Sequence, residues 1–336
     1  MKKLILILFV CISPIVYANV QPVKQEAAPK IDWFSYAHLR AASNFDDYTS
    51  LMIRRLKFWL KSTPEFSDKW SFKVQVLFTS NKQEKLFLQD AQAKYHVGLF
   101  SFDFGQFKPE YSLQRFQPDY LIPAIERAKA ITRLIPDGTI GVRDLGVQGN
   151  FHTRDNLLET HIGLFNGYGI NEYRFNNSGY LLTHKTGLNI NLEKDIALKF
   201  GYSLQYRKAQ NLKIPKVLPD SVYFTGNDFR YNLFALFASK YFDIQGEYLN
   251  ADLDGDISNG YYILSTVKIK KNQVVLGFED YKDLITTTNN KPYYRIGYNF
   301  LFNKYRMMLF VDNYFQYYEN KIQNYTASIQ FQYFIK

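Results

Sequence analysis

Residues 100–148 decide the fold of this chain, because they hold a strand, a long connection and a second strand: FSFDFGQFKPEYSLQRFQPDYLIPAIERAKAITRLIPDGTIGVRDLGVQ. At the start, aromatic residues alternate with small or polar ones, so Phe100, Phe102 and Phe104, followed by Gln106, share one face of a strand. The connection, Pro109–Gly141, is long and contains many apolar residues, so it is predicted to pack and not to be disordered. The inside of a wide barrel is a place where this connection could pack.

The N-terminal residues are typical of a secretory signal peptide. Two lysines precede the apolar run Leu4–Val16, and Ala18 fits a cleavage site that requires small residues. The run is shorter than a membrane-spanning helix, so we predict a signal peptide over residues 1–18, followed by a flexible linker over residues 19–30. Cys11 is the single cysteine and lies in the predicted signal, so the mature chain is expected to have no disulfide, thiol catalysis or Cys-bound metal.

Alternating segments along the rest of the chain predict an all-β fold. Short and long connections alternate between them, which is the pattern of a transmembrane antiparallel β-barrel with 16 strands; 14 strands remain the alternative. We expect the barrel over residues 31–336, with the long connection as an inward-folded constriction loop. Aromatic residues are 18% of the chain, enough for two interfacial girdles, although a soluble β-sandwich rich in aromatics would share this composition. The predicted strands cover residues 32–42, 51–61, 70–80, 86–96, 100–108, 142–153, 157–165, 181–192, 196–206, 229–239, 241–250, 261–269, 273–281, 292–301, 304–315 and 322–334.

Three short motifs stand in this order along the chain: Gly105-Gln106-Phe107-Lys108-Pro109, Ile125-Glu126-Arg127 and Arg143-Asp144-Leu145-Gly146-Val147. Together they resemble the phosphate-selective porin O and P family of bacterial outer membranes. The resemblance implies the outer membrane of a Gram-negative bacterium, a loop folded into the lumen, and relatives that form trimers. The family usually has serine after Glu-Arg, where this chain has Ala128.

Basic residues of the second predicted strand are the first part of the candidate site. Strict alternation places Arg55, Lys57 and Lys61 on one face, together with Trp59, and this mixed face is predicted to line the lumen. Arg54 would then point outward, unless it lies near the water interface or beside a β-bulge. The family resemblance, in contrast, places both Arg54 and Arg55 in the constriction wall, with Arg127 approaching from the loop.

Arginine at a narrow point attracts oxyanions, because the guanidinium donors match the geometry of phosphate. The loop as a whole is neutral, however, and Glu126 is interpreted as a salt-bridge partner that holds the loop to the wall. A general pore with some anion preference is therefore favoured over a dedicated phosphate trap, and a solvated wall without selectivity remains open. The predicted constriction and anion-binding residues are Arg54, Arg55, Lys57, Arg127, Lys129 and Arg133.

Other patterns give weaker signals. The sequence Asp252-Leu253-Asp254-Gly255-Asp256 resembles half of a calcium loop, but it lacks the downstream glutamate and equally fits a turn. The five histidines show no metal spacing, and there is no nucleophile motif such as Gly-x-Ser-x-Gly, so neither an enzyme nor a cofactor is predicted. The basic residues are scattered, which argues against nucleic-acid binding.

These observations predict a passive diffusion pore for small hydrophilic solutes with a preference for anions, phosphate-like oxyanions among them. The alternative is a barrel with a plugged lumen that serves adhesion or scaffolding. The expected partners are outer-membrane lipid, small anionic or polar solutes, the barrel-assembly machinery through the C-terminal strand, and further copies in a homotrimer.

Overall fold

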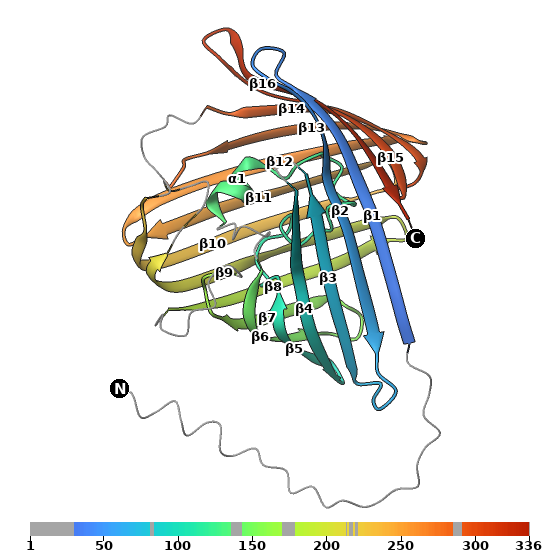
Figure 1. Cartoon of the computed structure of the whole chain (residues 1–336), viewed down its shortest axis with the longest axis vertical. Helices are drawn as coiled ribbons and strands as arrows, with labels where there is room; N and C mark the ends of the chain where they lie inside the picture. Colours follow the sequence, from blue (N-terminus) through green and yellow to red (C-terminus); the bar gives the residue numbers. More distant parts are fainter. Residues whose placement is uncertain are drawn as a thin grey trace, which may run out of the picture.

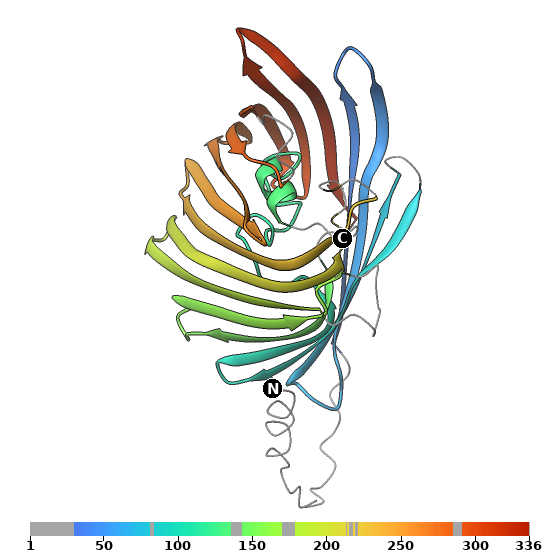
Figure 2. The same ribbon diagram turned by 90° about the vertical axis from the view of Figure 1, so that its left-hand side faces the viewer.

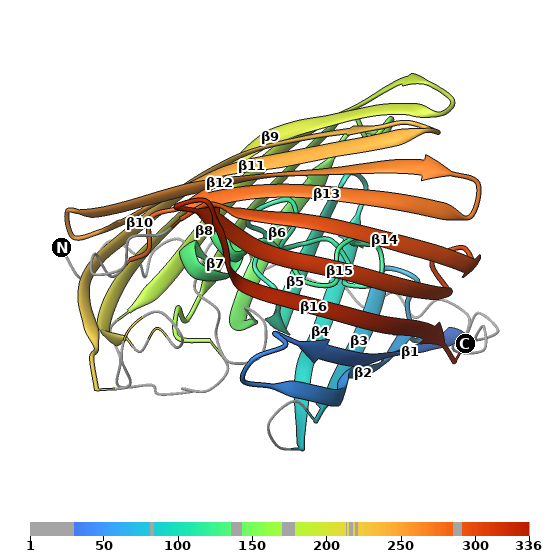
Figure 3. The same cartoon turned by 90° about the horizontal axis from the view of Figure 1, so that it is seen from above.

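The computed structural model describes residues 30–80, 84–135, 143–169, 179–212, 214, 218, 221–284 and 291–335. The predicted signal peptide, and the predicted linker up to residue 29, lie outside these residues. Within them, sixteen antiparallel strands form a closed barrel in which β1 pairs with β16. Figure 1 shows the barrel wall, and Figure 3 shows β16 lying beside β1 at the closure. The prediction of sixteen strands is confirmed, and the alternative of fourteen is wrong.

Each strand pairs with its neighbours in sequence, so the wall is one continuous meander. The strands are β1 (Lys30–Ser43), β2 (Thr49–Thr63), β3 (Trp70–Thr79), β4 (Lys85–Val97), β5 (Phe100–Phe107), β6 (Asp144–His152), β7 (Leu158–Phe165), β8 (Tyr180–Glu193), β9 (Ile196–Leu212), β10 (Phe224–Ala238), β11 (Phe242–Leu253), β12 (Asp256–Ile269), β13 (Asn272–Tyr281), β14 (Tyr293–Asn303), β15 (Met307–Tyr318) and β16 (Lys321–Phe334).

The two ends of the barrel differ in the length of their connections. The end that carries the C-terminus has turns as short as residues 98–99 and 270–271, whereas the opposite end carries the connections 108–143 and 166–179. In outer-membrane barrels the short turns face the periplasm, so the long connections mark the extracellular end. Two connections are shorter than predicted, because β9 and β10 extend to Leu212 and from Phe224, and β11 and β12 meet in a hairpin.

That hairpin explains the aspartate-rich segment that resembles half of a calcium loop. Asp254 and Gly255 have φ values of 56° and 102°, and the backbone N–H of Gly255 donates to Asp252 at 2.7 Å. Asp-Gly at the centre of a two-residue hairpin turn is strongly favoured, because both positions need positive φ. Among the described residues, no group of three or more His, Cys, Asp or Glu side chains is arranged to hold a metal ion.

The side chains of the wall alternate between lipid and lumen. In β5, Phe100, Phe102 and Phe104 face outward with 51%, 40% and 40% exposure, whereas Ser101 and Asp103 are buried inside. This confirms the apolar face predicted for this strand, up to Phe104. Gln106 does not continue it: its amide is buried and donates to the carbonyls of Leu88 and Gln89, both at 2.9 Å.

The described part of the connection between β5 and β6, residues 108–135, packs on inward-facing side chains of the later strands. Its apolar residues, including Tyr111, Ile131 and Leu134, form one buried cluster with Leu249, Tyr262 and other residues of β9–β14. The connection contains the short helix α1 (Lys129–Leu134), which Figure 2 shows within the curve of the later strands. No helix in the described part of the chain is long and apolar enough to cross a membrane.

Candidate functional site

The first family motif positions the start of the β5–β6 connection. Gly105 has φ of +107°, and a Cβ there would lie 2.3 Å from the carbonyl oxygen of Ala91, so only glycine fits. Phe107 then turns into a small apolar cluster, with its ring 5.3 Å from that of Phe165. The motif therefore ends β5 and directs the following residues away from the wall.

Lys108 and Pro109 begin the connection itself. The Nζ of Lys108 donates to the carbonyl of Arg115 at 2.8 Å and lies 5.1 Å from the centre of the Phe116 ring. Burial lowers the pKa of Lys108 well below its ordinary value, and repulsion from Arg143 and Arg127 lowers it further. This lysine holds a turn of the connection from within and offers little of its charge to a solute.

The third motif fastens the other end of the connection. Arg143 pairs with Asp90 of β4 at 2.9 Å, and both side chains are buried. The carboxylate of Asp144 accepts backbone N–H bonds from Leu145 at 2.8 Å and Gly167 at 2.7 Å, which also fixes the start of the next connection. The first and third motifs are thus placed where the connection leaves and rejoins the wall.

Strand β2 supplies the wall side of the site through a β-bulge. The register with β1 pairs His38 with Arg55 and Leu39 with Ile53, so Arg54 is the extra residue. Both Arg54 and Arg55 therefore reach the same side, against the outward orientation that strict alternation predicts for Arg54. Arg54 lies at a β-bulge, which is the exception under which it was not expected to point outward.

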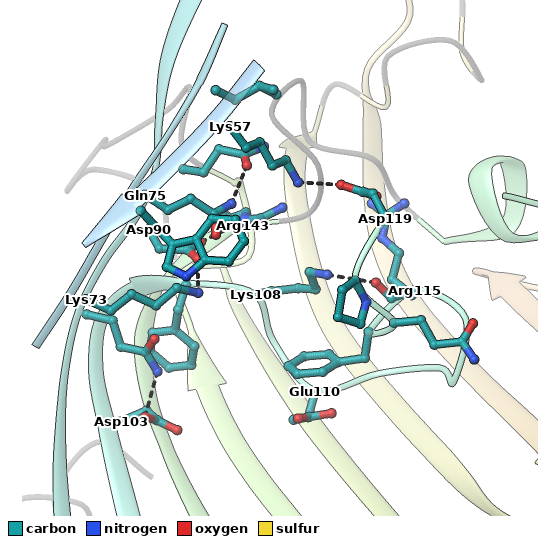
Figure 4. Close-up of a pocket in the computed structure, with 18 of the residues that line it drawn as sticks. Lys57, Lys73, Gln75, Asp90, Asp103, Lys108, Glu110, Arg115, Asp119 and Arg143 are labelled. Atoms are coloured by element: carbon teal, nitrogen blue, oxygen red, sulfur yellow. Dashed lines mark hydrogen bonds and ion pairs between the residues drawn. The ribbon is translucent and has the colours of Figure 1, made fainter. Parts of the chain in front are cut away.

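Asp119 is the centre of the site. Its carboxylate, 9% exposed, pairs with Arg55 at 2.8 Å, with Lys57 and with Arg127 of its own connection. The hydroxyl of Tyr36 adds a bond at 3.3 Å. Figure 4 shows Lys57 of the wall and Asp119 of the connection directed toward each other. Three of the predicted site residues therefore meet, but at a carboxylate and not around open space.

Glu126 makes a second contact between the connection and the wall. Its carboxylate lies 2.6 Å from Arg40, 2.7 Å from Arg54 and 3.8 Å from Arg55, which gives Glu126 the wall-binding contacts expected of it. Sequence reasoning missed Arg40, although Tyr36, His38 and Arg40 alternate on the first strand and could have been assigned to its inner face. Glu126 keeps 40% of its side chain exposed.

Opposing effects set the pKa values of the two carboxylates. Burial by itself raises the pKa of Asp119, but attraction to Arg55, Lys57 and Arg127 outweighs burial and holds it well below the usual range. Burial likewise raises the pKa of Glu126, while Arg54, Arg40 and Arg55 lower it overall. Because Glu126 is the more exposed of the two, water screens part of its attraction, and Asp119 is the more firmly held anion.

Lys129 and Arg133, predicted for the same site, lie elsewhere. The Nζ of Lys129 is 3.7 Å from the ring centre of Tyr293, and burial lowers its pKa to about 8, opposed in part by Glu279. Arg133 pairs with Asp283, just beyond the extracellular end of β13. Both residues belong to α1, and their partners fasten that helix to the later strands.

A cavity of about 1010 Å³ lies beside the Asp119 contact, against the earlier strands. Among the described residues that line it, twelve are lysine or arginine and six are aspartate or glutamate. Lys61 of β2 stands directly opposite Lys73 of β3, and Lys94 of β4 follows one strand further. Figure 4 shows Lys73, Asp90 and Arg143 on one side of this space and Lys108, Arg115 and Asp119 on the other. The lumen is thus divided into a filled apolar part and an open basic part.

Solved structures of outer-membrane proteins share this fold. OmpF of Salmonella typhi in complex with daunomycin has a TM-score of 0.64 at 12% identity, covering 91% of this chain and 97% of that chain. The outer membrane channel DcaP of Acinetobacter baumannii gives 0.60 at 12% identity, covering 93% and 99%. The trimer form of OmpT of Vibrio cholerae gives 0.62 at 11% identity, covering 92% and 100%. Comparison with curated protein sequences gave no significant match.

The sequence also matches a family. The profile of the phosphate-selective porin O and P family aligns with residues 33–270, which is more than half of the chain and includes all three motifs. The family and the barrel fold indicate a channel in the outer membrane of Gram-negative bacteria. This chain therefore belongs to the phosphate-selective porin O and P family and is an outer-membrane porin.

Proposed function

We propose that the porin prefers anions, and that it selects them along the basic part of its lumen. The observation that carries this proposal is the excess of cationic over acidic side chains around the cavity, twelve against six among the described residues. A water-filled passage lined by one sign of charge raises the local concentration of the opposite ion. Phosphate-like oxyanions are candidate solutes. Arg55 and Arg127 are already paired with Asp119, however, which argues for a general preference for anions over a dedicated phosphate site.

Within this proposal, the connection that packs on β9–β14 narrows the passage. Its contacts at Asp119 and Glu126 neutralise part of the arginine charge, so the lysines of β2–β4 contribute more to selectivity than the sequence suggests. Among those that line the cavity, Lys61 is exposed, whereas Lys73 and Lys94 pair with Asp90 and Asp103 of the wall. Lys129 and Arg133 are assigned to holding α1 and not to binding solute, because their partners are Tyr293 and Asp283. Arg54, Arg55, Lys57 and Arg127 keep their proposed place at the narrowest part.

Measurement of ion selectivity tests the proposal. In a planar bilayer with a KCl gradient, the wild-type pore should give a reversal potential of the sign expected for chloride. Lys61→Gln with Lys73→Gln should shift that potential toward cation selectivity, because both lysines line the cavity. Lys73 pairs with Asp90 of the wall and not with the connection, so its loss leaves Asp90 to Arg143 and does not remove a contact of the connection at Asp119 or Glu126. Arg55 and Arg127 are less suitable targets, since both pair with Asp119 and their loss would also release the connection.

A matched control uses two lysines outside the lumen. Lys270→Gln with Lys271→Gln removes the same charge from the short turn between β12 and β13. Salt screens exposed charges over about 10 Å at 0.1 M, so this variant should keep the wild-type reversal potential. Equal shifts in the two variants, or no shift in the first, would refute selection by the basic lumen.

The second candidate is a plugged barrel used for adhesion or scaffolding. It is favoured by one observation, the extensive apolar packing between the connection and β9–β14. Conductance separates the two candidates, because a plugged barrel carries no steps of current.

Four kinds of partner complete the proposal. The apolar outer face would be surrounded by outer-membrane lipid, small anionic or polar solutes would occupy the lumen, and the alternating strand β16 (Lys321–Phe334) would be recognised by the barrel-assembly machinery. A homotrimer is proposed from the resemblance to porins, one of which, OmpT of Vibrio cholerae, has a solved trimer form.

A further inference from the structure

We propose that the lumen contains a binding subsite for small anions that carry a flat ring, such as aromatic carboxylates, and that Trp59, Tyr120 and Lys61 form it. The proposal rests on the anion-preferring pore proposed above, and it names a class of solute that this pore would hold. Three observations support it: two rings that border the cavity, polar atoms on these rings that have no partner, and a lysine beside them that has no ion pair.

Trp59 and Tyr120 bring two aromatic rings to one wall of the cavity. Trp59 lies on the inner face of β2, between Lys57 and Lys61, and Tyr120 belongs to the connection. Both residues line the cavity, their ring centres are 6.3 Å apart, and the ring planes differ by only 15°. Because aromatic rings attract one another in offset and edge-to-face arrangements, this pair offers a surface on which a planar solute can rest.

Three further rings hold this pair in place. Phe34, the neighbour of Trp59 across β1, has its ring centre 4.0 Å from that of the indole. Phe334 meets the ring of Tyr120 edge-on at 5.2 Å, and Tyr305 lies 5.8 Å from the same ring. These three residues support the pair from outside the lining of the cavity. A surface that is already fixed before a solute arrives lowers the entropic cost of binding.

The polar atoms of the two rings are available to a solute. Among the described residues, neither Nε1 of Trp59 nor the hydroxyl of Tyr120 has a hydrogen-bond partner, and neither atom is closed off from water. Trp and Tyr groups usually find a partner when they are packed inside a protein. The indole N–H donates, and the phenol hydroxyl can do so as well. Two open donors beside the cavity therefore favour a solute that accepts hydrogen bonds, as a carboxylate does.

Lys61 supplies the positive charge. It follows Trp59 by two residues on the same face of β2, about 7 Å along the strand, so its flexible stem can bring the ammonium group over the indole. In the described part of the chain Lys61 makes no ion pair, whereas Lys57, on the other side of Trp59, pairs with Asp119. Asp32, directly opposite Lys61 on β1, weakens the attraction for an anion without pairing with the lysine. Lys61 can therefore bind the anionic group of a solute that rests on the rings.

The surroundings favour an aromatic carboxylate over a sugar acid. A sugar carries many hydroxyls, and each one requires a polar partner when it leaves water. The charged side chains next to the rings are already engaged with one another, because Asp119 holds Arg55, Lys57 and Arg127. Two donors, one cation and the ring faces are left, and this set matches a flat ring with one carboxylate.

The fluorescence of Trp59 tests the subsite directly. The chain has three tryptophans, so Trp33→Phe with Trp70→Phe keeps Trp59 as the single one. In the folded full-length barrel, para-bromobenzoate should quench this fluorescence to a saturating level, because the bound bromine lies against the indole. Bromide, which lacks the ring, and para-bromobenzyl alcohol, which lacks the charge, should quench without saturation over the same concentrations. Benzoate should displace the quencher at a lower concentration than glucuronate does.

Charge variants in this single-tryptophan protein test the role of Lys61. Lys61→Gln should raise the half-saturating concentration of para-bromobenzoate about tenfold, because a charge-assisted contact is lost. Asp32→Asn should lower that concentration, because the opposing carboxylate is gone. Lys271→Gln, on the short turn between β12 and β13, is the matched control and should leave it unchanged.

A second tryptophan gives a control for the quenching itself. Trp33→Phe with Trp59→Phe keeps Trp70, which lies on β3 outside the lining of the cavity, and should show no saturation. Saturation at Trp70 as well, equal effects of Lys61→Gln and Lys271→Gln, or stronger displacement by glucuronate would overturn the subsite. So would the absence of saturation at Trp59 in a pore that still prefers chloride. Saturation at Trp59 in a pore that prefers cations would instead support the subsite and refute the anion preference.

Discussion

At the scale of single residues, the site depends on Asp119 more than on any of the cations that surround it. Arg55 and Lys57 come from the wall and Arg127 from the connection, and all three meet at this carboxylate. Removal of one partner from a buried ion pair costs about 3–5 kcal/mol, because the remaining charge is left without compensation. Asp119 therefore couples the position of the connection to the charge of the wall.

The pKa of Asp119 gives a prediction for acid. The pKa of Asp119 in the folded protein lies below the ordinary value of about 4. The ionised carboxylate therefore holds the connection against the wall at every pH above that lowered pKa. This contribution is lost only as the pH falls through the lowered pKa. Single-channel conductance should therefore stay constant between pH 7 and about pH 4.5. It should rise in stronger acid, where the connection is released from the wall.

An Asp119→Asn variant is the control for this prediction. It lacks the ionised carboxylate at every pH, so its connection should already be loosened at pH 7. The acid-induced rise in conductance should be smaller than in the wild type, because only the contact of Glu126 is left to titrate. A rise between pH 7 and pH 5 that occurs in the wild type and is absent from the variant would contradict the lowered pKa of Asp119.

At the scale of elements, wall side chains hold the connection through its backbone. Glu247 of β11 accepts the N–H groups of Leu113 and Gln114 at 2.9 and 2.6 Å, and Glu279 of β13 accepts that of Ala130 at 3.0 Å. Further along, Tyr120 packs against Phe334 at the end of the last strand. The connection thus lies on the wall over a long path and is not held at the Asp119 contact alone.

Removal of the part of the connection that follows this path should widen the passage through the lumen. Deletion of residues 117–132 takes away Asp119, Glu126 and Arg127 while leaving the strands intact, and single-channel conductance should increase. Asp283→Asn, which breaks only the pair with Arg133 at the rim, should keep the wild-type conductance. Heat-modifiable migration on gels verifies that each barrel is folded. Unchanged conductance in a folded deletion variant would place the connection outside the conducting path.

The elements were predictable to different degrees. Alternation over short segments was enough to find all sixteen strands, because the inner and outer faces differ in polarity. The bulge at Arg54 depends on the register between β1 and β2, which one strand's sequence does not contain. Lys129 and Arg133 were assigned to the constriction because their loop carries Arg127, but their partners, Tyr293 and Asp283, are more than 140 residues away in sequence and are set by the tertiary fold.

At the scale of the whole molecule, the barrel is asymmetric inside. The later strands, β9–β14, carry the apolar residues that bury the connection, and the earlier strands line the open cavity with lysine and arginine. This division reconciles two properties that would otherwise conflict, a lumen that is largely occupied and a basic wall that water and ions can reach. The central claim is that the open part forms a continuous conducting path.

Conductance of the purified full-length protein in a planar bilayer tests that claim most directly. The open basic lumen predicts discrete steps of current, and in a salt gradient a reversal potential on the anion side. The contrary result is a protein that inserts into the bilayer and shows the heat-modifiable migration of a folded barrel, but carries no current. That result would contradict the pore and support the plugged barrel.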